Sequence, residues 1–261
     1  MIIGVLSAME KEHKQLVALL KNAHTEQQGR FTFTIGQIER ISTNTNSTNL
    51  TNNSCDSCSQ KERNQAPQNT LILMTCGIGK VNAAVGATTL IHYYHPDCII
   101  STGCAGGIDP DLQVMDVVAS TQVAYHDVTI PGCEHGQIQG LPARFRAEEQ
   151  LLEAIEDNSV KRGLICSGDQ FISDHSQLQA IKTQFPEALA VDMESAAIAH
   201  TCFLHAVPFL SFRILSDTPG ADEHLAQYFD FWDRMADHSF ETTRRFLTAL
   251  PTQFARLHFT D

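Results

Sequence analysis

The sequence predicts an α/β fold in which a mixed, largely parallel sheet is covered by helices. Short runs rich in β-branched and other apolar residues alternate with amphipathic stretches along most of the chain, and this alternation is typical of such folds. The 261 residues, 43% of them hydrophobic, can fill a sizeable core as one large α/β domain or two small ones.

Strands are expected where short apolar runs occur, and helices where apolar residues recur at helical spacing. In chain order, the predicted strands are residues 2–6, 31–35, 71–74, 98–102, 114–119, 163–166, 189–191 and 208–215. The predicted helices are residues 10–21, 80–94, 177–185, 194–205 and 222–247. The helix from residue 80 follows a glycine turn, and its small residues permit close packing on the sheet.

Residues 41–70 form a polar, Asn/Ser/Thr-rich segment that has almost no apolar anchors. Such a segment cannot bury enough surface to offset the entropy of ordering it. We expect a mobile, dispensable insertion within a hairpin made by strands 31–35 and 71–74. Cys55 and Cys58 in this segment have the spacing of half a zinc site, but no second Cys or His pair follows at ligand spacing.

The composition argues against several classes of partner. The chain has 30 acidic and 18 basic side chains, and the formal charge of −12 disfavours binding to nucleic acid or to an anionic membrane. No apolar run approaches the roughly 20 residues that span a bilayer. The N-terminus lacks the basic flank of a signal peptide. A cytoplasmic protein with reduced cysteines and a small-molecule ligand is therefore expected.

Ligands of open α/β sheets bind beyond the carboxyl ends of the strands, so the strand-to-helix junctions are the candidate sites. At the first junction Glu12 lies near the start of a helix, where an acidic residue is also favoured by the helix dipole alone. At the second, residues 77–80 resemble an anion-binding loop but lack the full P-loop spacing, which favours a simple tight turn.

Two further junctions carry small or charged residues. Residues 102–107 are a run of tiny residues at the end of a strand, which indicates either a close approach of a ligand to the backbone or a bulge. Glu194 lies where a strand meets a helix, and Arg213 and Asp217 lie at the end of another strand. Taken alone, the last two are also consistent with a structural ion pair.

Six segments in register resemble the 5′-methylthioadenosine/S-adenosylhomocysteine nucleosidases. They are residues 4–12, 77–84, 102–107, 167–172, 191–197 and 213–217. The resemblance covers essentially the whole chain except the insertion. It implies a single domain with a three-layer αβα fold of the nucleoside phosphorylase type, usually a homodimer, that uses no metal or cofactor.

The resemblance also implies a role for each matching residue. Glu12 is the expected base that activates water, Asp217 the acid that protonates adenine N7, and Arg213 the residue that orients them. The other residues expected to contact the substrate are Cys104, Ala105, Gly106, Phe171, Ile172, Met193, Glu194 and Ser216. Within this set Glu194 is expected to hold the ribose hydroxyls, and Phe171 to stack on adenine.

The chemistry of the reaction agrees with those roles. Cleavage of a ribosyl bond to adenine develops positive charge on the sugar and negative charge on the base. Carboxylates must therefore surround the sugar, while an acid must protonate the purine. Because an ordinary aspartic acid is ionised at neutral pH, Asp217 needs a raised pKa or a proton shared with the bound base.

Three alternatives remain at this stage. A futalosine or aminofutalosine hydrolase would share the same acids. A phosphorylase would need cationic groups for phosphate, yet the first arginine of the chain is Arg30 and Glu12 would repel the anion. A binding protein without catalysis would be expected to have lost an acid. Cys104 stands where the family has serine, and its thiol is expected to weaken polar contacts without abolishing activity.

Overall fold

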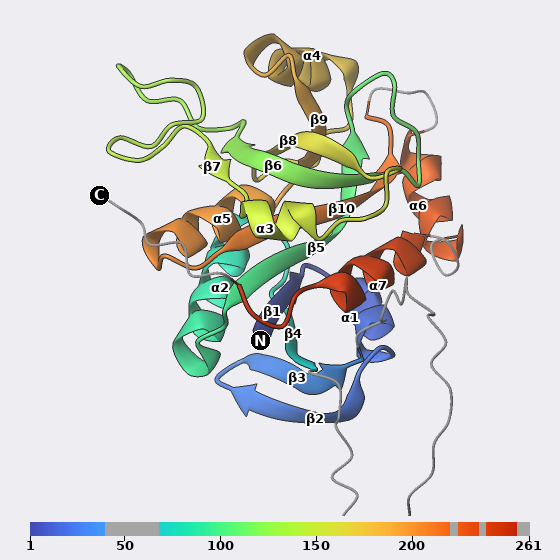
Figure 1. Cartoon of the computed structure of the whole chain (residues 1–261). Coiled ribbons are helices and arrows are strands. Elements are labelled where there is room, and N and C mark those ends of the chain that lie inside the picture. Colours follow the sequence, from blue (N-terminus) through green and yellow to red (C-terminus); the bar gives the residue numbers. More distant parts are fainter. Residues whose placement is uncertain (40–67, 220–223, 235–238, 255–261) are drawn as a thin grey trace, which may run out of the picture.

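The computed structural model describes residues 1–39, 68–219, 224–234 and 239–254 (Figure 1). Within these residues the chain order is β1 Ile2–Ser7, α1 Glu10–Val17, β2 Lys21–Gln28, β3 Phe31–Ile38, β4 Asn69–Thr75, α2 Lys80–Tyr94, β5 Cys98–Gly107, β6 Val117–Tyr125, β7 Phe145–Arg146, α3 Glu149–Glu153, β8 Lys161–Ser167, α4 His175–Gln184, β9 Ala188–Asp192, α5 Ser195–Leu204, β10 Phe209–Asp217, α6 His224–Arg234 and α7 Ser239–Ala249.

The strands form one mixed sheet, as predicted. Parallel pairings join β1 to β4 and β5, β5 to β10, and β8 to β6 and β9. Antiparallel pairings join β3 to β2 and β4, β6 to β7 and β10, and β5 to β9. The pairings of β5, β10, β6, β8 and β9 close on themselves, so this end of the sheet curls into a ring.

Helices cover both faces of the sheet and confirm the expected three layers (Figure 1). On one face α2 and α5 bury small and aliphatic side chains against the strands. On the other face Leu16 of α1, Phe231 of α6 and Phe246 of α7 pack on the strands. Ile3 and Val5 of β1 point to this second face and Leu6 to the first, which is the alternation of a strand buried on both sides.

Several predicted boundaries were wrong. The helix expected over 10–21 ends at Val17. The strand β2, which begins at Lys21, was not predicted, because its exposed polar residues give no apolar alternation. Within the helix expected over 222–247, the described residues form α6 up to Arg234 and α7 from Ser239. The strand expected over 114–119 begins at Val117 and continues to Tyr125. The short elements α3 and β7 were not predicted.

The most consequential difference concerns the run of tiny residues after position 102. The strand predicted to end there continues to Gly107, because this part of β5 pairs with β10 on one side and with β9 on the other. The expected antiparallel pairing of β3 with β4 is confirmed. The insertion at 41–70, with Cys55 and Cys58, lies almost entirely outside the described residues. None of the described helices is long and apolar enough to cross a membrane.

Candidate active site

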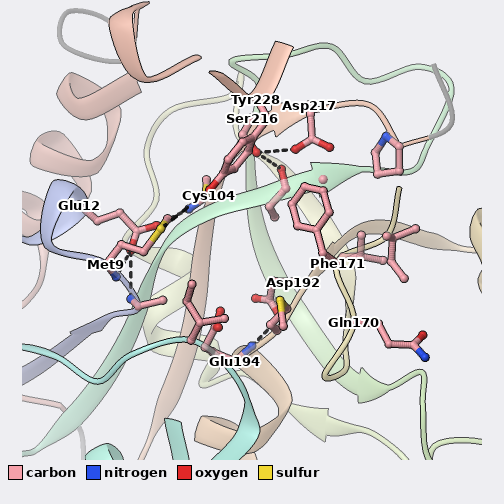
Figure 2. Close-up of a pocket in the computed structure, with 18 residues that line it drawn as sticks. Met9, Glu12, Cys104, Gln170, Phe171, Asp192, Glu194, Ser216, Asp217 and Tyr228 are labelled. Atoms are coloured by element: carbon pink, nitrogen blue, oxygen red, sulfur yellow. Dashed lines mark hydrogen bonds between the residues drawn. The ribbon is translucent and has the colours of Figure 1, made fainter. Parts of the chain in front are cut away.

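A pocket lies at the carboxyl ends of β1, β5, β9 and β10, where the sheet topology predicts a ligand site (Figure 2). The residues that the sequence predicted for the site line this pocket, with one exception. Those in the lining are Glu12, Cys104, Ala105, Gly106, Phe171, Ile172, Met193, Glu194, Ser216 and Asp217. Arg213, the exception, is 1% exposed and lies behind the pocket wall.

Glu12 is fixed in the pocket by backbone donors. It belongs to the first turn of α1, and its Oε2 accepts hydrogen bonds from the N–H groups of Ala8 and Met9, both at 3.0 Å. Its Oε1 accepts a bond from the N–H of Cys104, also at 3.0 Å. Burial raises the pKa of Glu12, while the charge of Arg213 and these backbone donors oppose the rise. The carboxylate is thus held in one orientation by groups that favour its charged form.

Arg213 is bound to Asp192 rather than to Asp217. Its Nε donates to Asp192 Oδ2 at 2.7 Å, and its Nη2 donates to Ser101 Oγ at 2.8 Å and to Ser195 Oγ at 3.1 Å. Arg213 thus lies behind the pocket lining, and its expected role in orienting the catalytic groups stays a prediction. The strand places this side chain in the protein interior, where a guanidinium needs an anion and several hydrogen-bond acceptors.

Gly103 separates Arg213 from Glu12. A Cβ added at this position would lie 2.6 Å from both Arg213 Nη1 and Glu12 Oε1, and the φ of Gly103 is +151°. Both groups therefore contact the bare backbone of β5, in a conformation that side-chain-bearing residues rarely adopt. A small residue is therefore needed at position 103 so that Arg213 and Glu12 can pack against β5. This is a second reason for the tiny residues at 102–107, beside the expected approach of a ligand.

Glu194 is held by the glycine loop that precedes α2. Its Oε1 accepts a hydrogen bond from the N–H of Gly79 at 2.9 Å, and the next N–H in the loop, that of Lys80, donates to Asp169 Oδ1 at 2.8 Å. The loop therefore does bind anions, but the anions are carboxylates of the chain itself. Burial and the neighbouring Asp192 charge raise the pKa of Glu194 to about 7, against the opposing charge of Arg213.

Asp217 lies at the end of β10, apart from Glu12 across the pocket (Figure 2). It is 3% exposed, and Ser216 Oγ donates to its Oδ1 at 2.6 Å. Adjacent strand residues normally point to opposite faces, but the pairing register of β10 with β5 shifts between Leu215 and Asp217. This irregularity explains why Ser216 and Asp217 both line the pocket.

Aromatic and sulfur-containing residues form the apolar part of the pocket. Phe171 is 46% exposed, and its ring meets the ring of Tyr228 edge-on, with centroids 5.6 Å apart. The hydroxyl of Tyr228 lies 3.9 Å from Met9 Sδ. An exposed aromatic face beside buried carboxylates suits a ligand with a flat ring and a polar portion.

Sequence reasoning did not assign Met9, Asp192 or Tyr228 to the site, although all three line the pocket. Met9 and Asp192 fall within the motifs that resemble the family. Their nearness in sequence to Glu12 and Glu194, respectively, could have assigned them to the site. Tyr228 lies in α6 and carries no local signal, because only the tertiary fold brings this helix to the pocket. Among the described residues, no group of three or more His, Cys, Asp and Glu side chains is arranged to hold a metal ion.

Comparison with known proteins places this geometry in context. The model of the phosphorylase superfamily matches residues 63–250. A 5′-methylthioadenosine/S-adenosylhomocysteine nucleosidase of Chromohalobacter salexigens is 35% identical over 91% of this chain and 92% of its own length. The corresponding nucleosidase of Anoxybacillus flavithermus is 41% identical over 69% of this chain and 81% of its own.

Solved structures agree with these matches. The nucleosidase of Neisseria meningitidis, in complex with methylthio-immucillin-A, superimposes with a TM-score of 0.80 at 32% identity and covers 95% of this chain and 99% of its own. The nucleosidase of Colwellia psychrerythraea, in complex with adenine, gives a TM-score of 0.81 at 29% identity and covers 97% of each chain.

The raised pKa of Glu194 predicts a pH-dependent stability. Between its ordinary pKa of 4.5 and about 7, the folded protein retains a proton that the unfolded chain has lost, so the free energy of unfolding falls as the pH rises through this range. Glu194→Gln removes the titration and keeps an oxygen for Gly79. We expect the variant to be more stable than the wild type at about pH 8, by roughly 1–3 kcal/mol, and to gain less at about pH 5.

Urea denaturation at both pH values measures this difference. The control is Glu187→Gln, because Arg144 beside Glu187 holds the pKa of that carboxyl below its ordinary value despite partial burial. The control should give no gain at high pH. A Glu194→Gln variant whose stability changes with pH as steeply as that of the wild type contradicts the assignment.

Proposed function

Because the chain belongs to the 5′-methylthioadenosine/S-adenosylhomocysteine nucleosidases of the phosphorylase superfamily, we propose that its pocket hydrolyses the N-glycosidic bond of these two nucleosides with Glu12 and Asp217 as working carboxylates. The enzyme is an N-glycosyl hydrolase that releases adenine and a 5′-thioribose product. The observation that carries the residue assignment is that Asp217 lies apart from Glu12 and Glu194 within one pocket (Figure 2).

The sugar side of the pocket is assigned to Glu12 and Glu194. Glu12 has three backbone N–H donors, whereas a single backbone N–H donates to Glu194. Burial raises the pKa of both carboxyl groups, but the additional donors favour the charged form of Glu12. We therefore assign the shared proton to Glu194 and the charge to Glu12. An ionised Glu12 can accept a proton from an attacking water, and a protonated Glu194 can donate to a ribose hydroxyl.

The base side is assigned to Asp217 and Phe171. Both Phe171 and Ile172 line the pocket; Phe171 is proposed to stack its ring on adenine, and Ile172 to read the edge of the base through its backbone. Asp217 acts as the acid that protonates N7, so that the purine leaves as a neutral molecule. Ser216 fixes this carboxyl through the hydrogen bond to Oδ1. Arg213 contributes its positive charge to Glu12 from behind the pocket lining.

Water is the proposed nucleophile rather than phosphate. The described residues that line the pocket include no lysine or arginine. The two successive N–H groups at the start of α2, which resemble a phosphate site, already donate to Glu194 and Asp169. A phosphate ion would therefore meet carboxylates where it needs cationic donors.

We also propose that the enzyme acts as a cytoplasmic homodimer. Val81 and Val85 lie four residues apart in the first turns of α2, and Ile78 lies in the loop just before the helix; they are 73%, 49% and 53% exposed, respectively. An apolar stripe of this kind favours contact with a second copy of the chain. Because Ile78 also lines the pocket, such a contact would lie beside the substrate.

The catalytic assignment predicts large losses on substitution of either acid. Glu12→Gln and Asp217→Asn are each expected to lower kcat by at least about 100-fold, because each removes a proton-transfer group without changing the size of the side chain. The measurement is adenine release from methylthioadenosine and S-adenosylhomocysteine. Glu10→Gln is the matched control, since Glu10 is an exposed acid in the same helical turn.

The same assay separates the alternatives. Preference for aminofutalosine would identify a different nucleosidase, and strict dependence on phosphate with ribose 1-phosphate as product would identify a phosphorylase. If both variants released adenine at the wild-type rate while retaining the native circular dichroism spectrum, the roles of Glu12 and Asp217 would be wrong.

Cys104 is expected to act through its backbone. Its N–H holds Glu12, and burial raises the pKa of its thiol, which therefore stays neutral. Cys104→Ser keeps the N–H and restores a stronger donor, so turnover should be preserved or raised. Steady-state kinetics on the folded variant provide the measurement, and a collapse of kcat would contradict this view.

The dimer predicts a specific effect of charge on α2. Val81→Glu should weaken self-association at least about tenfold, because it buries a carboxylate in an apolar contact. Sedimentation equilibrium measures the dissociation constant. Phe229→Glu is the control, because Phe229 is 67% exposed but belongs to α6, on the opposite face of the sheet. A wild-type protein that sediments as a monomer would exclude the dimer.

A further inference from the structure

Two loops on either side of the pocket are joined by a set of contacts that the reaction chemistry does not use. Residues 77–80 lead into α2, and residues 168–172 follow β8. Asp169 accepts a hydrogen bond from the N–H of Lys80 through Oδ1, at 2.8 Å. The N–H of Asp169 in turn donates to Asp127 Oδ2 at 2.9 Å. Asp169 is therefore anchored through both its backbone and its side chain.

Lys80 completes the connection. Its Nζ donates to Asp127 Oδ2 at 2.7 Å and lies 3.9 Å from Asp169 Oδ2. The Lys80 and Asp127 side chains are 25% and 16% exposed, so their ion pair is partly shielded from water, whereas the Asp169 side chain is 48% exposed. The longer contact with Asp169 is thus weak. The hydrogen bond from the Lys80 N–H carries most of the link to Asp169.

The charge on Asp127 supports this arrangement. Burial alone would raise its pKa, but the hydrogen bond from Lys80, the backbone N–H of Asp169 and the Lys80 charge lower it below the ordinary value. Asp127 is therefore ionised at neutral pH and can accept both hydrogen bonds at once. The contacts among Lys80, Asp127 and Asp169 are called the loop clamp below.

Gly79 shows how closely the two loops approach. Its φ is +94°, and a Cβ added there would lie 3.0 Å from Asp169 Oδ1. The same glycine donates its N–H to Glu194. The N–H of Gly79 therefore holds Glu194, and the next N–H, that of Lys80, holds Asp169 in the loop that carries Phe171. A shift of residues 77–80 would displace residues 168–172 as well.

We propose that Asp169 is a positioning residue that fixes the distance between the adenine-binding loop and the carboxylate assigned to the ribose. This inference rests on the proposed function. Asp169 does not line the pocket, but Phe171 and Ile172, two and three residues later, do. Its carboxylate occupies the start of α2 next to Glu194, and so ties the base side of the pocket to the sugar side.

The proposal predicts a change in substrate binding rather than in chemistry. Phe171 and Ile172 contact the base in both the ground state and the transition state, so their displacement removes uniform binding and raises KM. Asp169→Ala is expected to raise KM about tenfold for both substrates, which corresponds to about 1.4 kcal/mol, and to change kcat less than about threefold. Asp169→Asn keeps an oxygen for the Lys80 N–H and should restore KM to within about threefold of the wild type.

A matched control separates positioning from stability. Asp174 lies on the same connection, and its side chain accepts a hydrogen bond from the N–H of Gln177 at the start of α4, but it does not line the pocket and makes no contact with Lys80 among those described. Asp174→Ala removes a helix cap without touching the loop clamp. It should lower the melting temperature and leave KM unchanged.

Calorimetric titration with adenine tests the clamp independently of turnover. Weaker adenine binding by Asp169→Ala, with recovery in Asp169→Asn, supports the proposal even if the wild type does not cleave either nucleoside, an outcome that would refute only the proposed function. If Asp169→Ala binds adenine as tightly as the wild type, or if Asp174→Ala weakens binding equally, the positioning role is overturned.

Discussion

The active site depends on the buried ion pair of Arg213 with Asp192. A guanidinium that is 1% exposed has lost its hydration, and its burial is tolerated only because Asp192, Ser101 and Ser195 supply acceptors. The pair does not contact the ligand space through Arg213, yet the Arg213 charge opposes the rise in pKa that burial causes at Glu12 and Glu194. Without it, burial would raise the pKa of both carboxyl groups further.

The single positive charge of Arg213 does not neutralise all the buried carboxylates around it, which favours a proton on one of them. One guanidinium faces three buried carboxyl groups, those of Asp192, Glu12 and Glu194. Asp192 contacts Arg213 directly, and three backbone N–H groups donate to Glu12, whereas one donates to Glu194. Burial raises the pKa of both glutamates, to about 7 for Glu194. The raised pKa of Glu194 costs folding stability at neutral pH, and under the proposed function it supplies a protonated carboxyl beside the ionised Glu12. Stability and catalysis therefore make opposite demands on the same residue.

Local sequence patterns identified most of the pocket but not the connections behind it. Glu12, Glu194 and Asp217 were candidates because each follows a strand, and the resemblance of the surrounding motifs to the nucleosidases assigned them to one site; all three line the pocket. The pairing of Arg213 with Asp192 was missed, since a partner 21 residues away on another strand leaves no local trace. The polar edge strand β2 was missed because an exposed strand has no apolar alternation. Tyr228 was missed because α6 reaches the pocket only through tertiary packing.

The helix N-termini around the pocket explain which ligands the fold accepts here. In α/β proteins such termini commonly bind phosphate, because their first N–H groups lack partners. In this chain Glu12 accepts N–H bonds at the start of α1, Asp192 at the start of α5, and Glu194 and Asp169 at the start of α2. The positive ends of three helices are thus occupied by carboxylates of the protein itself. A phosphorylated ligand would have to displace one of these buried anions, whereas an uncharged thionucleoside sugar needs only the hydrogen-bonding groups that they present.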